Sequence, residues 1–510
     1  MKFLIIDGYT DEPAGLGVPP YIGTYPRYSA GVLYKYKYPV KYITIDKLRN
    51  IKDFDFDKFD VIISICGFHT PGKYLNANPA TLKELVYLLY NFKGIKIIGG
   101  PASTKYGSSY EGGTLKDESK LLNFFDIVAG ENLELTLMEY IKNNFNIEKI
   151  DFENCKFDEN YYNKIRDIAI YGSKIVNHHP LYPNVICEIE TYRGCSRHIS
   201  GGCSFCTEAR KYKYPIFRDE KDIIEEVKSL KENGINYFRI GRQPCIYSYK
   251  AIDSDREEVP KPNVESINKL FKGLHLLNPK VLHIDNANPK VISTYEKESY
   301  EITKILIRYC TGGNVAAFGV ESFDEKVIKA NNLLTYPEDV IKSIKILNEL
   351  GKLRSPTGLP YFLPGINLLF GLKGERKETY SINYQYLKEI LNSGYLLRRI
   401  NIRQVVPFFN TDITEKDIAK FKKRKNLFKK FKEKIRNEID NEMLKRVVPK
   451  GTVLKDVFVE INDREDLYFG RQFGSYPILV GIENKDLKIG SYVDVVITGH
   501  GKRSITGKVI

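Results

Sequence analysis

Short apolar runs that end in a glycine or another turn residue recur along most of the chain, and stretches with helical spacing of apolar residues lie between them. In the first 145 residues, such runs occupy residues 3–6, 61–65, 95–98 and 127–128. A repeated order of strand, glycine-rich turn and helix predicts a parallel open sheet that binds ligands at the carboxyl ends of its strands. We therefore expect an α/β fold that begins with a Rossmann-like domain over residues 1–145.

The alternation resumes at residue 185, after a polar linker over residues 146–184. Six runs that follow the linker have the length and composition of buried strands. They occupy residues 185–191, 235–240, 281–284, 315–318, 364–370 and 400–406. Six parallel strands with helices between them predict a partial (β/α)6 barrel over residues 185–415, with its chemistry at the carboxyl ends of the strands.

Three of the eight cysteines fall within twelve residues, in the loop after the first barrel strand. Cys195, Cys203 and Cys206 have the spacing Cys-x7-Cys-x2-Cys. One clustered group among scattered cysteines suits a metal site in a reducing compartment better than a disulfide framework. Three thiolates are one short of a closed tetrahedral zinc site, whereas an iron–sulfur cluster held by three cysteines leaves one iron open to another ligand. From spacing alone, a zinc knuckle or incidental thiols stay open.

The cysteine loop resembles the cluster-binding loop of radical S-adenosylmethionine (SAM) enzymes. The commonest spacing in that family is Cys-x3-Cys-x2-Cys, with an aromatic residue before the last cysteine. Phe205 and the Cys203-x2-Cys206 pair match this pattern, while the seven-residue gap after Cys195 departs from it. Two further stretches, Gly-Val-Glu-Ser at 319–322 and Gly-x2-Gly-Glu at 371–375, resemble landmarks of cobalamin-fused members. A zinc knuckle explains none of these landmarks.

The resemblance implies a [4Fe–4S] cluster on Cys195, Cys203 and Cys206, SAM as a second cofactor, and an external electron donor. It also implies SAM contacts at the ends of the barrel strands and in the cysteine loop. The candidate SAM-binding residues are Phe205, Gly241, Arg242, Gln243, Asn286, Glu321 and Ser322. Residues 241–243 replace the usual motif that meets the SAM amino group. Each of these polar residues could equally be a satisfied strand end.

The order of elements in residues 1–145 resembles the cobalamin-binding domain that is fused to many radical SAM enzymes. The candidate cobalamin-binding residues all lie in turns after strands: Thr70, Pro71, Gly99, Gly100, Pro101, Gly130 and Glu131. The Asp-x-His-x-x-Gly motif of other cobalamin proteins, whose histidine ligates cobalt, is absent, as it is from many radical SAM members. A Rossmann-like domain without a ligand stays open, and we expect His69 to be a loop or core histidine.

Positive charge gathers after the barrel. Residues 416–450 contain fourteen Lys and Arg against five Asp and Glu, so they carry +9 of the chain's formal +14. Apolar residues at helical spacing predict a basic helical segment over residues 416–446. A solvated basic face and a phosphate-binding helix are both consistent with this pattern.

The last residues, 447–510, contain short alternating strands separated by glycine turns, which predicts a small β-barrel. The run at 490–498 and the terminal Thr-Gly-Lys-Val resemble a TRAM domain, an RNA-binding module of tRNA-modifying enzymes. A barrel used only for packing stays open. The candidate RNA-binding cations are Lys422, Lys423, Arg424, Lys425, Arg471, Lys502 and Arg503.

The chain has no run of about 18 apolar residues, so we expect no membrane span and no membrane partner. Its first residues have the pattern of a buried strand and not of a signal peptide, which makes the cytoplasm the default location. The oligomeric state stays open.

Together, the resemblances imply a cobalamin-dependent radical SAM methyltransferase that modifies tRNA at an unactivated carbon. One such change would convert threonylcarbamoyladenosine to its hydroxynorvalyl form. A tRNA methylthiotransferase-like enzyme is an alternative, but its N-terminal domain needs three cysteines and residues 1–150 contain only Cys66. Further alternatives are a radical SAM methyltransferase of a protein substrate and a non-catalytic RNA-binding protein with a structural cluster.

Overall fold

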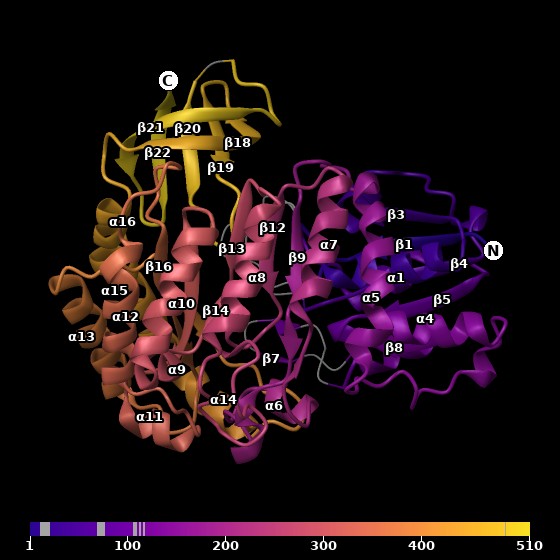
Figure 1. The fold of residues 1–510 in the computed structure, drawn as a ribbon, viewed down its shortest axis with the longest axis horizontal. Helices are drawn as coiled ribbons and strands as arrows, with labels where there is room; N and C mark the ends of the chain where they lie inside the picture. The colour runs from indigo at the N-terminus through magenta and orange to yellow at the C-terminus, as the bar shows by residue number, and fades with distance from the viewer. Residues whose placement is uncertain (11–20, 69–76, 106–109, 112–113, 116–117, 485) are drawn as a thin grey trace. The chain divides into compact units, whose positions relative to one another are not determined.

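The computed structural model describes the chain except for residues 11–20, 69–76, 106–109, 112–113, 116–117 and 485 (Figure 1). The chain divides into two compact units, which are described separately. Unit 1 contains Met1–Glu190, Arg218–Phe238 and Phe408–Asn410. Unit 2 contains Thr191–Phe217, Arg239–Pro407 and Thr411–Ile510.

Unit 1 is built on a parallel sheet of five strands in the order β3-β1-β4-β5-β8. Counted along the chain, this is the order 2-1-3-4-5 of a doubly wound sheet, in which ligands bind where the strand order reverses. The Rossmann-like prediction is therefore confirmed. The strands are β1 (Phe3–Asp7), β3 (Val40–Thr44), β4 (Val61–Ile65), β5 (Ile95–Gly99) and β8 (Ile127–Gly130).

Helices and short strands complete unit 1. The pair β2 (Tyr21–Ile22) and β9 (Ile186–Glu190) is parallel, and β6 (Tyr110–Glu111) pairs antiparallel with β7 (Thr114–Leu115). The helices are α1 (Thr24–Lys35), α2 (Ile45–Arg49), α3 (Leu82–Leu88), α4 (Leu133–Lys142), α5 (Tyr161–Gly172) and α7 (Glu220–Glu232). Residues 146–184, interpreted from the sequence as a linker, thus include α5, whose Tyr161 and Tyr162 are buried.

Helices α1 and α5 pack so closely that glycine is required where they touch. A Cβ atom on Gly31 would lie 2.0 Å from the carbonyl oxygen of Ile168, and one on Gly172 would lie 2.0 Å from that of Arg27. No real side chain tolerates such a distance, so the two glycines fix the approach of the helices.

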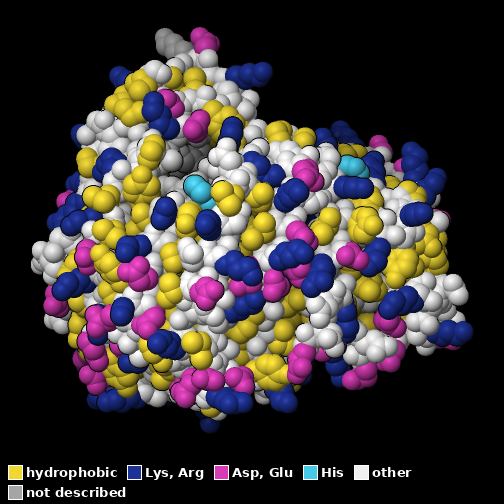
Figure 2. Space-filling view, viewed as in Figure 1, with side chains coloured by type: hydrophobic (Ala, Val, Ile, Leu, Met, Phe, Trp, Pro, Cys, Tyr) yellow, Lys and Arg dark blue, Asp and Glu magenta, His cyan; other side chains and the backbone are white. Residues whose placement is uncertain are grey.

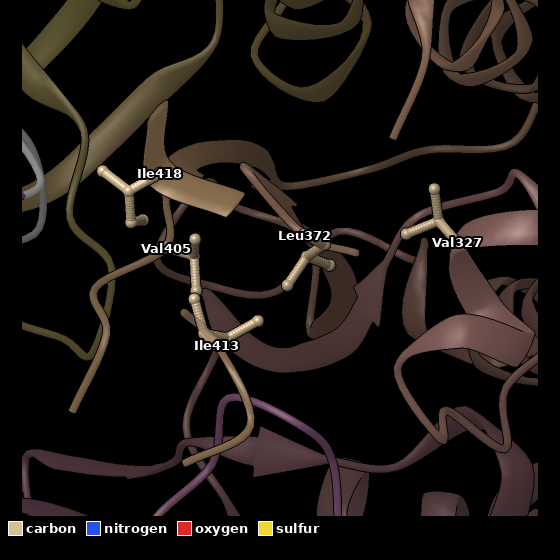
Figure 3. Close-up of a cluster of buried hydrophobic side chains, with 5 residues drawn as sticks. All are labelled: Val327, Leu372, Val405, Ile413 and Ile418. Atoms are coloured by element: carbon tan, nitrogen blue, oxygen red, sulfur yellow. The ribbon is translucent and has the colours of Figure 1, made fainter. Parts of the chain in front are cut away.

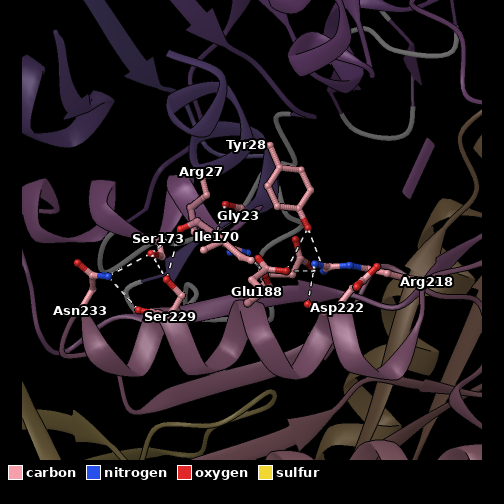
Figure 4. A network of polar contacts seen from close by, with 11 residues as sticks. Gly23, Arg27, Tyr28, Ile170, Ser173, Glu188, Arg218, Asp222, Ser229 and Asn233 are labelled. Atoms are coloured by element: carbon pink, nitrogen blue, oxygen red, sulfur yellow. Dashed lines mark hydrogen bonds and ion pairs between the residues drawn. The ribbon is translucent and has the colours of Figure 1, made fainter. Parts of the chain in front are cut away.

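A buried ionic network ties α1 to α7 and β9 (Figure 4). The Glu226 carboxylate accepts from both Arg27 and Arg218, and all three side chains are fully buried. Arg27 also donates to the backbone carbonyl of Glu188. Burial by itself would raise the pKa of Glu226, but the two guanidinium groups outweigh it and lower that pKa.

The six strands predicted for the partial barrel are all present, and the first of them is β9. The third is interrupted at Asp285, which separates β13 from β14. In unit 2, β14, β15, β16 and β17 form one parallel sheet in that order. The strands after β9 are β12 (Tyr237–Gly241), β13 (Val281–Ile284), β14 (Asn286–Ala287), β15 (Asn314–Glu321), β16 (Phe362–Phe370) and β17 (Arg399–Gln404).

Helices alternate with these strands, as the sequence predicts. A short antiparallel pair, β10 (Tyr192–Arg193) and β11 (Ile216–Phe217), frames the cysteine loop. The helices are α6 (Glu208–Lys211), α8 (Val264–Leu276), α9 (Pro289–Thr294), α10 (Glu296–Tyr309), α11 (Glu325–Ala330), α12 (Pro337–Gly351) and α13 (Lys377–Asn392).

The predicted basic segment is helical and leads into a closed five-stranded barrel, β18-β19-β20-β22-β21, so the expected small β-barrel is present. The helices are α14 (Glu415–Lys423), α15 (Lys425–Ile435), the π-helix η8 (Arg436–Asp440) and α16 (Asn441–Val447). The strands are β18 (Val453–Arg464), β19 (Leu467–Arg471), β20 (Leu479–Glu483), β21 (Tyr492–His500) and β22 (Ser504–Val509).

On the face shown in Figure 2, Lys and Arg side chains are interspersed with Asp and Glu, and apolar side chains are scattered. Within the described residues, none of the helices has both the length and the apolar character needed to span a membrane.

Candidate functional site

The three clustered cysteines lie in the loop between β10 and β11. Glycines with positive φ shape this loop: Gly194 (+95°) precedes Cys195, and Gly201 (+78°) and Gly202 (+74°) precede Cys203. A Cβ on Gly194 would lie 2.5 Å from the Tyr214 carbonyl oxygen, and one on Gly202 would lie 2.6 Å from the Ala209 Cβ. The loop therefore needs glycine both for its backbone conformation and for its close packing.

Arg210, in α6, holds the end of the cysteine loop. Its Nη1 donates to the carbonyl oxygens of Cys203 (2.8 Å) and Cys206 (2.7 Å), and its Nη2 donates to the Asp412 carboxylate (2.9 Å). One guanidinium group thus fixes the backbone at two of the three cysteines. Sequence reasoning missed this residue, although it follows Cys206 by four positions, one helical turn later.

Asn331 and Asn332, after α11, hold the middle of the same loop. The Asn331 side-chain oxygen accepts from the Ser204 hydroxyl at 2.7 Å, and its backbone carbonyl accepts from the Ser204 N–H at 3.0 Å. The Asn332 amide donates to the carbonyl oxygens of Ser200 (3.1 Å) and Gly202 (2.9 Å). These contacts join residues more than 120 positions apart, so no local sequence signal identifies them.

Phe205 also anchors the loop. Its half-buried ring packs against a cluster of buried apolar residues that lie in and after the barrel. Figure 3 shows the cluster itself. The five residues of this cluster are Val327, Leu372, Val405, Ile413 and Ile418. The ring therefore has a packing role, beside its predicted role in covering SAM.

The three thiols lie in an environment that strongly disfavours a lone thiolate. Burial raises the pKa of all three thiols, and neighbouring thiols contribute to the rise at Cys195 and at Cys203, where the pKa reaches about 12. The Arg197 side chain opposes this effect at Cys203, where its Nη1 lies 3.8 Å from Sγ. Backbone N–H groups of Arg197 and Glu208 oppose it at Cys195 and Cys206. Such N–H groups and cations would stabilise sulfur ligands once a metal had displaced the protons.

Among the described residues, no three His, Cys, Asp or Glu side chains lie close enough to hold a single metal ion. In a [4Fe–4S] cluster, each cysteine binds a different iron, so its three cysteines lie around a larger body. Three cysteine thiolates, from Cys195, Cys203 and Cys206, suit an iron–sulfur cluster that leaves one iron open to another ligand.

The predicted SAM residues at the ends of β12 and β14 make hydrogen bonds with protein groups. Gln243 is buried, accepts from the Thr191 hydroxyl at 3.3 Å and donates to the Ile240 carbonyl at 3.1 Å. Asn286 donates to the Gln243 carbonyl at 3.2 Å. Gly241 ends β12, and Arg242 follows it with a φ of +57°. These contacts place the group at adjoining strand ends and give its polar side chains protein partners.

Glu321 and Ser322 differ in the hydrogen bonds that their side chains make with the protein. The buried Ser322 hydroxyl accepts from the Asp324 N–H at 3.1 Å and contacts Asn383 Oδ1 at 3.5 Å, so it holds the start of α11. Glu321 has a φ of +64° at an irregularity of β15, an uncommon conformation for a residue with a side chain. Burial raises its pKa to about 8, and its charge acts on Cys203. No hydrogen bond of its carboxyl group is found among the described residues.

The predicted cobalamin residues that the structure describes lie at the carboxyl ends of β5 and β8. Gly100 has a φ of +93°, its N–H donates to the Gly130 carbonyl at 2.8 Å, and a Cβ on it would lie 2.8 Å from the Cys66 carbonyl oxygen. Gly99 ends β5, Pro101 begins the next short helix, and Gly130, with a φ of +64°, ends β8 before Glu131. Thr70, Pro71 and His69 lie outside the described residues.

The predicted RNA-binding cations differ in their exposure to solvent. Lys422, Lys423, Lys425, Lys502 and Arg503 are exposed. Arg424 is half-buried and lies 3.8 Å from Glu375. Arg471 is buried and makes two 2.6 Å hydrogen bonds to Glu460, so its guanidinium group is directed to a neighbouring strand and not to solvent. Its assignment as a surface cation is therefore wrong, because side chains of a closed barrel alternate between its two faces.

Comparisons with known proteins agree with this site. Residues 189–369 match the model of the radical SAM superfamily. An uncharacterized protein of Methanocaldococcus jannaschii is 68% identical over 511 residues, which are 100% of this chain and 93% of the relative. The ribosomal protein uS12 methylthiotransferase RimO of Petrotoga mobilis is 22% identical over 464 residues, 88% of this chain and 90% of RimO.

A solved structure shares the fold at low identity. It is the radical S-adenosylmethionine methyltransferase TsrM from Kitasatospora setae, with cobalamin and a [4Fe–4S] cluster bound. It aligns with a TM-score of 0.53 and 12% identity over 81% of this chain and 76% of TsrM.

The match over residues 189–369, with the cysteine loop, shows that this part of the chain is a radical SAM domain. It belongs to the same protein family as the Methanocaldococcus jannaschii relative. A radical SAM domain implies a [4Fe–4S] cluster and SAM as cofactors, together with a source of electrons.

Proposed function

We propose that the chain is a cobalamin-dependent radical SAM methyltransferase that modifies tRNA at an unactivated carbon. The observation that carries the proposal is the cysteine loop, in which Arg210, Asn331 and Asn332 fix the chain that bears the clustered thiols. The cluster and SAM supply one-electron chemistry that generates a carbon radical, and cobalamin supplies the methyl group. The protein's own part is to fix the sulfur ligands, to present Glu321 beside them and to exclude water.

Unit 1 supports the cobalamin part of the proposal. Its strand order favours a ligand site at the carboxyl ends of the strands, where Gly100 and Gly130 bring two backbone turns together. TsrM, which shares the fold, is a methyltransferase whose structure contains cobalamin. In this chain the turns around Gly99, Gly100, Pro101, Gly130 and Glu131 would carry the contacts.

Methylthiolation, the first alternative, fits unit 1 less well. A methylthiotransferase carries three cysteines for a second cluster in its N-terminal domain, and residues 1–150 have only Cys66. Burial raises the pKa of that thiol, whose Sγ contacts the carbonyl oxygens of Gly67 (3.7 Å) and Ala80 (3.5 Å). A second cluster in this domain would need two further cysteines, and residues 1–150 do not contain them.

Two features support tRNA as the substrate. The segment α14–α15 presents exposed lysines, including Lys422, Lys423 and Lys425, and a small closed β-barrel follows it. A radical mechanism is needed only where the carbon is neither acidic nor nucleophilic. The terminal methyl group of the threonyl part of threonylcarbamoyladenosine, beside the anticodon, is such a carbon, and its methylation gives the hydroxynorvalyl form.

A protein substrate is the second candidate, and one observation favours it. The RimO relative, which aligns over 88% of this chain, is named for a ribosomal protein target. Methyl transfer to a protein would use the same cluster and the same sheet, and the basic helices would then be a solvated face.

The test uses tRNA and ribosomes from a strain that lacks the gene. The reconstituted full-length enzyme is incubated with a reductant, cobalamin and SAM carrying a deuterated methyl group. We expect deuterium in the hydroxynorvalyl nucleoside, measured by mass spectrometry, and none when Cys206→Ala enzyme is used. Deuterium found only in ribosomal protein would favour the protein substrate over tRNA. If neither tRNA nor ribosomal protein gained deuterium, the proposal of methyl transfer would be overturned.

A further inference from the structure

Four arginines from three elements of unit 2 form a cluster that the cysteine site does not use. Arg398 and Arg399 lie at the start of β17, Arg436 begins η8, and Arg503 lies in the turn between β21 and β22. Each is close enough to shift, or to be shifted by, the charge of another member, and Arg436 also donates to the Ile400 carbonyl at 2.8 Å. This set is called the arginine cluster below.

Protein groups satisfy the arginine cluster only in part. Arg436 is paired with Asp440. Arg398 donates to the Tyr476 carbonyl, but its Nε is buried without a partner among the described residues. Arg399 stacks on the Tyr476 ring at 4.1 Å, and its buried Nε is likewise without a partner there. Within the described residues, Arg503 forms no ion pair.

Negative charge near the arginine cluster is scarce and already engaged. Asp440 is held by Arg436, and Asp285 is held by Arg239 at 2.5 Å and by the Tyr476 hydroxyl. Lys432 adds another cation, whose pKa is lowered by burial and by Arg436 and Arg503. The cluster therefore holds more positive charge than the protein compensates.

The pKa values of the arginines report the same imbalance. Burial, with repulsion from Arg399 and Arg503, lowers the pKa of Arg398 to about 9. Burial also lowers the pKa of Arg399. Uncompensated charge that protein surrounds is unfavourable unless a counter-ion completes the site. The exposed Arg503 side chain keeps the cluster accessible from solvent.

We propose that the arginine cluster binds a phosphate group. Guanidinium groups offer planar, paired N–H donors that match the oxygens of phosphate, and several of them together suit its multiple charge. The cluster lies at the amino end of β17, whereas Glu321 lies at the carboxyl end of β15 in the same parallel sheet. It is therefore a separate site from the one that holds the cysteines, and the inference does not depend on the proposed methyl transfer.

The direct test is isothermal titration of the full-length protein with inorganic phosphate, against chloride at the same ionic strength. Arg398→Gln and Arg503→Gln remove one cation each. Arg256→Gln is the matched control, because Arg256 is 77% exposed and, among the described residues, its ion pair is with its neighbour Asp255. We expect saturable binding by the wild type and the control, and at least tenfold weaker binding by both cluster variants. Equal binding by all four proteins, or no saturable binding by the wild type, would overturn the proposal.

A second measurement separates ligand binding from a structural role. In phosphate-free buffer, Arg503→Gln should unfold at an equal or higher urea concentration than the wild type, because one repelling cation is removed. In phosphate, the wild type should gain resistance to urea that the variant does not gain. A loss of resistance in phosphate-free buffer, without any loss of the phosphate effect, would make Arg503 a structural residue and contradict the proposal.

The source of the phosphate group is resolved with a tRNA transcript as a second probe. If inorganic phosphate competes with the transcript and Arg503→Gln weakens tRNA binding, the site takes a phosphate of the RNA backbone. If Arg503→Gln abolishes phosphate binding and leaves tRNA binding unchanged, the site takes a small phosphorylated compound. Either result supports the phosphate site, and only the first bears on the proposed tRNA substrate.

Discussion

At the residue scale, the cysteine loop depends on one cation outside the cysteine motif. Arg210 bridges the carbonyl oxygens of Cys203 and Cys206 and is fixed by Asp412. A lysine keeps the charge but lacks the fork of donors that reaches both carbonyls. We therefore expect Arg210→Lys to fold and to hold its cluster less firmly.

The loss of iron to a chelator measures this effect. Hydrogen bonds to a charged donor contribute about 1.5–3 kcal/mol, so we expect Arg210→Lys to lose iron roughly tenfold faster than the wild type. Arg464→Gln, which removes an exposed cation at the end of β18, is the control. An unchanged rate of iron loss in Arg210→Lys would show that the loop is held without this side chain.

The sequence predicts the residues of the site that form a local pattern and misses those that packing brings in from a distance. The three cysteines and the glycines beside them form a local pattern, so the loop was predictable. Asn331 and Asn332 reach the loop from more than 120 residues away, and only the packing of α11 brings them there. Arg471 is the opposite case, a residue that the sequence predicts as an exposed cation because arginine is usually exposed. Only the pairing of the barrel strands directs its side chain to Glu460.

At the element scale, α1 and α7 depend on Glu226. This residue is the carboxylate that Arg27 and Arg218 share, and all three side chains are fully buried. Glu226→Gln would leave two buried guanidinium groups without this carboxylate, which typically costs about 3–5 kcal/mol of unfolding free energy. Circular dichroism during urea unfolding measures the loss. Glu225→Gln, on the same helix, removes an exposed carboxylate 3.9 Å from Lys221 and should change the free energy by about 0–1 kcal/mol.

If Glu226→Gln reduced the unfolding free energy as little as Glu225→Gln does, this account of the network would be contradicted. The pairs that make up the network are separated by as many as 199 residues, so the sequence pattern alone did not reveal it. The strands, in contrast, could be predicted from the apolar runs, because a strand that is buried on both faces contains few polar residues.

His283 joins β13 to the loop after β19 and makes that junction sensitive to pH. Its Nδ1 accepts from the Ser475 N–H at 3.1 Å, and its Nε2 lies 3.1 Å from the Gly312 carbonyl, so the neutral ring fits both contacts. Burial lowers the pKa of His283 to about 4. The unfolded chain takes up a proton near pH 6.5, before the folded protein does, so stability is lost as the pH falls from about 6.5 towards 4.

We expect this residue to contribute a pH-dependent loss of about 3 kcal/mol over that window. His283→Asn keeps an acceptor for Ser475 and removes the titrating group, so its stability should depend less on pH than that of the wild type. Urea unfolding at pH 7.5 and pH 4.5 measures the difference, with the exposed His275→Asn as control. Equal pH dependence in the wild type and His283→Asn would refute the assignment.

At the scale of the whole molecule, the chain has a doubly wound sheet, a partial barrel with the cysteine loop, and a small closed β-barrel. The order of these parts could be predicted because each has its own sequence period and turn residues. Residues 161–172, which the sequence analysis includes in the linker, form the helix α5 with buried residues at Ile165, Ile168 and Ala169. Its buried face becomes evident only when α1 is present to cover it.

The central claim is that Cys195, Cys203 and Cys206 hold the cluster that acts on SAM. The most direct measurement is the formation of 5′-deoxyadenosine from SAM by anaerobically reconstituted protein and a chemical reductant. The account predicts the product with the wild type and with Cys155→Ala and Cys310→Ala, and its loss with Cys203→Ala and Cys206→Ala. If the Cys203→Ala and Cys206→Ala proteins form 5′-deoxyadenosine at the wild-type rate, the cluster is elsewhere and the account of this site is wrong.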